Sequence, residues 1–132
     1  MSVHAYKRQK MVSGWTRIEL LLYLYDRAIT SLEACETAKN SGDEKEYGKH
    51  FLDANKTLLA IHAGLKPEDE IAFNVARLLH FVSQSVIAND FQGAVKVLRS
   101  LRDGFAAIEV EANQLESSGQ IPSAEKEYTF RV

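Results

Sequence analysis

The sequence predicts an all-α protein: an antiparallel up-down four-helix bundle with an N-terminal arm over about residues 1–15 and a short C-terminal tail over 118–132. Three observations support this fold class. The chain contains only two prolines, so the stretches between helix breakers are long. Apolar residues recur at alternating spacings of three and four, and no stretch shows the sustained alternation of a strand. The connections between the expected helices are very short, which places consecutive helices antiparallel.

The first helix is expected over residues 17–39. Thr16 and Glu19 form a capping box at its start, in which Thr16 accepts a hydrogen bond from the Glu19 N–H and Glu19 reaches back to Thr16. Trp15 and Leu20 have the spacing of a hydrophobic staple. The sequence Asn-Ser-Gly at 40–42 ends the helix.

This first helix carries more apolar residues than one buried face requires. Its core face contains Ile18, Leu21, Leu22, Tyr25, Ala28, Ile29, Leu32 and Cys35. Leu20, Tyr23 and Leu24 fall on or toward the opposite side, where a contiguous apolar patch would mark an interaction site. Two covers are open at this point: the N-terminal arm, which includes Tyr6, or a helix of a partner.

Three further helices are expected over 43–65, 67–89 and 91–117. Ser41 and Glu44 have the spacing of a second capping box, and Pro67 is placed to begin the third helix. The apolar seams of the three helices are Tyr47, Phe51, Ala54, Leu58, Ile61 and Leu65; Ile71, Val75, Leu78, Val82 and Val86; and Phe91, Ala94, Leu98, Leu101, Phe105, Ile108, Ala112 and Leu115. The third helix, like the first, has large apolar residues outside its seam. These are Phe73, Phe81 and Ile87.

Composition restricts the classes of function. The net charge of −2, with Lys and Arg scattered among acids, argues against a nucleic-acid partner. The longest uncharged apolar run, residues 20–25, is too short to span a membrane, and the N-terminus lacks the apolar segment of a signal peptide. The single cysteine, Cys35, is compatible with a reducing compartment. We therefore expect one soluble, cytosolic domain over 1–132.

No reaction centre is evident. A di-iron bundle needs Glu-x-x-His motifs, and none of the four histidines follows a glutamate by three positions. Cys35 lies on the core side of its helix, and there is no glycine-rich phosphate loop. The sequence thus predicts no catalytic residue, no metal, no cofactor and no small-molecule substrate, and favours a binding protein over an enzyme.

Histidine phosphotransfer is the alternative function, with His62 or His50 as the phosphoacceptor. Phosphotransfer domains are also four-helix bundles, with an exposed histidine followed by Leu, Lys and Gly. Here Gly64 precedes Leu65 and Lys66, and His62 lies at a helix end instead of mid-helix. A third possibility is a structural bundle that self-associates through its apolar patch.

The chain resembles the FliS family of flagellin-specific export chaperones over about residues 5–116. Four matches occur in the family's order: Ala5-Tyr6-Lys7; the run from Glu19 to Ile29, which contains Leu-Tyr-Asp; Glu70-Ile71-Ala72-x-Asn74-Val75-x-x-Leu78; and Ala88-Asn89-Asp90. The segment LRSLRDGF at 98–105 is similar to a family pattern that ends in Trp. The family's Thr-Ala-Ser-Pro before the first helix is replaced by Gly-Trp-Thr-Arg at 14–17.

The resemblance implies a cytosolic chaperone that binds the disordered C-terminal segment of flagellin. Binding would prevent premature polymerisation and keep flagellin competent for flagellar type III secretion, with export-gate components as further partners. The residues expected in the flagellin groove or its arm cap are Tyr6, Leu20, Tyr23, Leu24, Tyr25, Ala28, Phe73, Asn74, Phe81 and Ile87.

Overall fold

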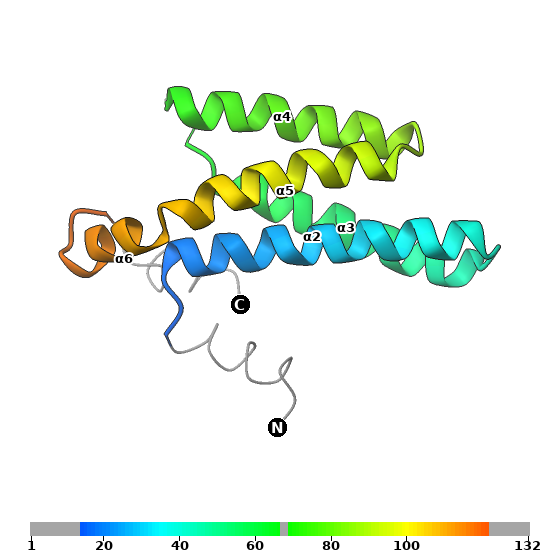
Figure 1. Ribbon diagram of the computed structural model, residues 1–132, viewed down its shortest axis with the longest axis horizontal. Coiled ribbons are helices and arrows are strands. Elements are labelled where there is room, and N and C mark those ends of the chain that lie inside the picture. Colours follow the sequence, from blue (N-terminus) through cyan, green and yellow to red (C-terminus); the bar gives the residue numbers. More distant parts are fainter. Residues whose placement is uncertain (1–13, 67–68, 122–132) are drawn as a thin grey trace. The chain divides into compact units, whose positions relative to one another are not determined.

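The computed structural model describes residues 14–66 and 69–121, and the regular structure in these ranges is all helical, without a strand. Its helices are α2 (Arg17–Asn40), α3 (Glu44–Ala63), α4 (Glu70–Ile87), α5 (Phe91–Ala107) and α6 (Glu109–Ser117), labelled in Figure 1. The helices expected over 17–39 and 43–65 are confirmed to within two residues at each end.

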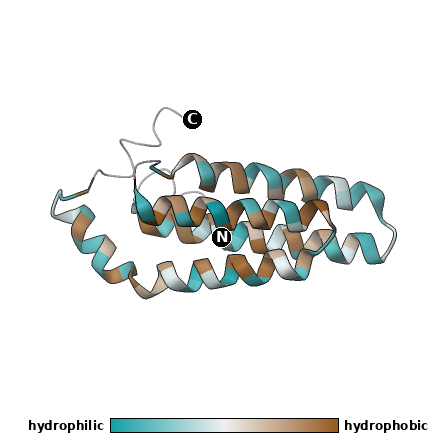
Figure 2. Cartoon of the chain, turned by 90° about the horizontal axis from the view of Figure 1, so that it is seen from above, coloured by the Kyte–Doolittle hydropathy of each residue, from teal (hydrophilic) through white to brown (hydrophobic). Residues whose placement is uncertain are grey.

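The chain divides into two compact units, one formed by residues 1–22 and 105–132 and the other by Tyr23–Gly104. The second unit is a helical bundle. In it, α3 returns antiparallel to α2 after a short turn, and α5 does the same after α4 (Figure 1). Brown and teal segments alternate along these helices in Figure 2, as expected of helices that bury one face only.

The core of this unit is built from the inner faces of its helices. Its fully buried members include Tyr25, Leu32, Cys35, Ile61, Val82 and Leu98. The rings of Tyr47 on α3 and Phe91 on α5 meet edge to face, with centroids 6.2 Å apart. On the α2 side of α5, Arg99 pairs with Glu33 and Arg102 with Asp26 at 2.9 and 3.0 Å.

The start of α2, in the other unit, confirms the first capping box. The Thr16 N–H donates to Glu19 Oε1, and the Glu19 N–H donates to Thr16 Oγ1, both at 3.4 Å. Residues nearly a hundred positions away complete the cap: Asn113 Oδ1 lies 2.6 Å from the Thr16 hydroxyl, and Glu116 accepts from the Arg17 N–H at 2.9 Å. A carboxylate at this end of a helix is favoured by the helix dipole.

The helix expected over 91–117 is instead two helices, because α5 ends at Ala107 and α6 begins at Glu109. Ile108 between them has φ −108° and ψ 13°, and its N–H donates to the Phe105 carbonyl in a tighter turn. The expected seam is buried only at its beginning, since Leu98 is fully buried whereas Ile108 is 47% exposed. None of the residues of α6 is buried.

One expected cap and one expected helix start are wrong. The cap of α3 is Asp43, which accepts from the Glu46 N–H at 3.1 Å. Ser41 bonds back to the carbonyl of Thr37 instead of pairing with Glu44. The third helix begins at Glu70, capped by Asp69, rather than at Pro67, which lies outside the described residues. In both cases an aspartate, whose carboxylate accepts readily from a free N–H, takes the cap position.

Candidate partner-binding surface

Helix α4 buries a regular seam with spacings of three and four. This seam is Ala72, Val75, Leu79, Val82 and Val86. It differs from the expected seam at two positions, because Ile71 and Leu78 lie 70% and 43% exposed while Leu79 is buried. The sequence held the signal for this, since the observed seam keeps a strict three-four alternation that the expected one breaks at its end.

The exposed part of α4 carries large apolar side chains; at about 100° per residue, Phe73 and Phe81 lie opposite the buried seam, and Ile71, Leu78 and Ile87 flank it. We name this set the α4 apolar face: Ile71 (70% exposed), Phe73 (58%), Leu78 (43%), Phe81 (52%) and Ile87 (71%). Asn74 is exposed among them. No side chain of α4 makes an ion pair or a hydrogen bond with another helix in the part of the chain that the structure describes. The face therefore offers apolar area, interspersed with the exposed polar residues Arg77, His80 and Gln84.

The residues expected on α2 divide between core and edge. Tyr25 and Ala28 are fully buried, and burial raises the pKa of the Tyr25 hydroxyl well above its usual range. Leu20, expected on or toward the far side of the helix and covered by the arm or by a partner helix, is buried at 7% exposure. Tyr23 and Leu24 are half-buried.

A polar network joins α2 to α3 beside Tyr23. Asp53 accepts hydrogen bonds from Arg27 Nη2 at 2.6 Å and Nε at 3.1 Å, and from the Ser31 hydroxyl at 2.6 Å. The Tyr23 hydroxyl accepts from Arg27 Nη1 at 3.3 Å. The Arg27 guanidinium holds the pKa of Asp53 below its usual value, with the Ser31 bond acting in the same direction. Tyr23 is thereby fixed at the edge of the helix pair.

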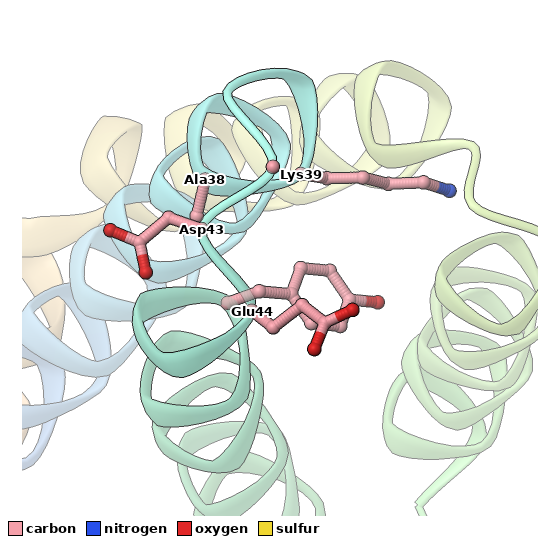
Figure 3. A pocket seen from close by; sticks show the side chains of 6 residues that line it. Ala38, Lys39, Asp43 and Glu44 are labelled. Atoms are coloured by element: carbon pink, nitrogen blue, oxygen red, sulfur yellow. The ribbon is translucent and has the colours of Figure 1, made fainter.

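Tyr6, expected in the arm, lies outside the described residues. A hollow of about 330 Å³ at the α2–α3 turn is lined by Ala38, Lys39, Gly42, Asp43, Glu44 and Tyr47 (Figure 3). None of its lining residues is an expected partner-binding residue, and Asp43 there already caps α3.

His50, His62 and Cys35 occupy ordinary positions on their helices. His62 is exposed in the last turn of α3, and His50 Nε2 lies 3.3 Å from Glu46 Oε2 one turn away. Cys35 is buried, and burial raises the pKa of its thiol. Among the residues described, no group of three or more His, Cys, Asp or Glu side chains is placed to hold a metal ion. Within the same ranges, no helix has the length and apolarity to cross a membrane.

Comparison with known proteins identifies the family of this chain. The family model described as "Flagellar protein FliS" matches residues 2–112. The chain belongs to the FliS family. Members of this family are flagellar export chaperones for flagellin, and the family is not known for enzymatic activity. No curated protein and no solved structure matched the chain. The matched segment of this FliS-family chain includes the α4 apolar face.

Proposed function

We propose that this FliS-family chain is a cytosolic export chaperone that binds the disordered C-terminal segment of flagellin. Binding prevents premature polymerisation and keeps flagellin competent for flagellar type III secretion. The observation that carries the proposal is the α4 apolar face, five large apolar side chains that are each at least 43% exposed in a chain of a flagellin-chaperone family. An apolar patch of this kind on a folded protein marks an interaction site.

The contact surface that we propose is centred on α4. It retains four of the residues expected from sequence, Phe73, Asn74, Phe81 and Ile87, and adds Ile71 and Leu78. Tyr23 and Leu24, half-buried on α2, are proposed as its edge. The prediction that Tyr6 caps the surface in the free protein stays a prediction. We further propose that α2 to α5 form the antiparallel up-down bundle that keeps α4 rigid.

The chemistry of the face suits a segment that folds as it binds. A disordered segment that forms an amphipathic helix can lay its apolar side on an exposed helical face. Aromatic side chains such as Phe73 and Phe81 contribute large contact area. Ordering the segment costs conformational entropy, so a large contact gives only moderate affinity. Moderate affinity fits a client that the export machinery must later remove.

Calorimetric titration with a C-terminal flagellin peptide from the same organism tests the proposal. We expect a complex and a gain of helical circular dichroism on mixing. The double variant Phe73→Ala/Phe81→Ala should weaken the complex at least about tenfold, roughly 1.4 kcal/mol, because it removes two aromatic anchors. Leu59→Ala is the matched control, since Leu59 is 69% exposed but lies on α3.

Absence of binding at high micromolar peptide would contradict the proposal, and equal loss of affinity in the α4 and α3 variants would contradict the assignment to α4. Export-gate components remain further proposed partners. No feature around His62 or His50 in the described ranges favours phosphotransfer. Sedimentation of the chain with and without the peptide separates client binding from self-association.

A further inference from the structure

Helix α3 carries a second seam on its outer side. Its members follow spacings of four and three, and we name them the outer seam: Lys45, Lys49, Leu52, Lys56, Leu59 and Ala63. All six are exposed, Leu52 to 56% and Leu59 to 69%. At about 100° per residue, the seam lies opposite the buried residues Ala54, Leu58 and Ile61 of the same helix. The bundle core does not use it.

The charge of the outer seam is positive and uncompensated. Lys45, Lys49 and Lys56 make no ion pair with any residue that the structure describes. The acids of α3 nearest to Lys49 already have partners: Asp53 is held by Arg27, and Glu46 lies beside His50. The lysines therefore keep their charge available to an incoming group.

From this pattern we propose that the outer seam docks an acidic amphipathic helix of a partner protein. The seam extends over the 19 residues from Lys45 to Ala63, about 27 Å along the helix axis, which is the length of about five turns. Two leucines seven residues apart match the repeat by which one helix packs along another. The lysine stems extend the apolar contact, and their ammonium groups meet carboxylates at the edges of the partner helix.

This partner is chemically different from the client proposed for α4. The α4 apolar face contains two phenylalanines and no lysine, whereas the outer seam contains three lysines and no aromatic residue. A membrane is the less suitable occupant, because interfacial helices bury a continuous and often aromatic apolar face, and here Lys56 separates the two leucines. The two surfaces can thus be tested separately.

The test uses the full chain and a fluorescently labelled synthetic 18-residue peptide. The peptide repeats Leu every seven residues and flanks each Leu with Glu; a scrambled peptide of equal composition and a peptide with Lys in place of Glu are the controls. Fluorescence anisotropy should show binding of the first peptide only, weakening as the salt concentration rises. Lys49→Glu/Lys56→Glu should weaken it at least about tenfold, and Leu52→Ala/Leu59→Ala should weaken it severalfold.

Lys96→Glu on α5 is the charge control, and Phe81→Ala on α4 is the surface control; both should leave peptide affinity unchanged. Circular dichroism confirms that every variant is folded. Equal binding of the scrambled peptide, or no effect of the lysine reversals, would overturn the proposal. Sedimentation on anionic phosphatidylglycerol vesicles that depends on the same lysines, in the absence of peptide binding, would assign the seam to lipid and overturn it too.

Discussion

Helices α3 and α4 bury their inner faces in the same way but differ in how they are held and in what they expose. The inner edge of α3 is tied to α2 by the Arg27–Asp53–Ser31 network and contacts α5 through the ring of Tyr47. Helix α4 buries an apolar seam, and within the described ranges none of its side chains bonds to another helix. Outward, α3 presents lysines with two leucines, and α4 presents phenylalanines and branched aliphatic residues. Both helices expose apolar area, and the charge around that area distinguishes the two outer faces.

The largest expected effect is the difference in the free energy of unfolding between variants on the inner face and variants on the outer face of each helix. Ile61→Ala on α3 and Leu79→Ala on α4 should each lower the free energy of unfolding by about 2–5 kcal/mol, because they open cavities in the core. Leu59→Ala and Phe81→Ala should change it by no more than about 0.5 kcal/mol. Urea denaturation measures all four variants. A loss above about 2 kcal/mol in either exposed variant would show that its side chain supports the fold.

A smaller effect concerns the hydrogen bonds by which Asp53 on α3 is joined to Arg27 and Ser31 on α2. Within the described ranges, α4 has no such bonds to another helix. Because Arg27 and Ser31 lower the pKa of Asp53 in the folded state, its contribution is complete above the ordinary aspartate pKa of about 3.9 and is lost as the pH falls below that value. Asp53→Asn should cost about 1 kcal/mol or less at neutral pH, since the Arg27 and Asp53 side chains are 45% and 31% exposed and partly screened by solvent.

The same variant should flatten the acid dependence of stability, measured by urea denaturation at neutral and acidic pH. Asp103→Asn is the matched control, because the Asp103 side chain is 74% exposed in a longer ion pair with Arg102. If the free energy of unfolding of Asp53→Asn fell with acid as much as that of the unchanged chain, the Arg27–Asp53–Ser31 network would not stabilise the packing of α3 on α2.

The sequence predicted the all-helical class and the first capping box best. The Thr16–Glu19 capping box depends on neighbours three residues apart, and it is confirmed. The core face of α2 is also confirmed, with only Leu21 half-buried, because one helix face suffices to define it. The break at Ile108 was not predictable, since neither glycine nor proline stands there and the end of burial along α5 depends on tertiary contacts.

Long-range contacts account for the errors at the candidate site. A helical wheel identifies one buried face of a helix. It placed Leu20 on or toward the other side and could not show that this side chain is also buried. Thr16 and Arg17 at the start of α2 donate hydrogen bonds to Asn113 and Glu116, so residues near the C-terminal end of the described chain reach this helix, which no local pattern reveals. The reverse error, Ile71 and Leu78 assigned to the core, arose because two overlapping seams share α4.

An NMR titration tests the central claim, that the α4 apolar face binds the flagellin segment, most directly. The chain, labelled at phenylalanine rings and leucine methyl groups, is titrated with the C-terminal flagellin peptide to saturation. We predict that the ring signals of Phe73 and Phe81 shift while the methyl signals of Leu52 and Leu59 keep their positions. Saturation of binding with unmoved Phe73 and Phe81 signals, or with shifts confined to Leu52 and Leu59, would contradict the account.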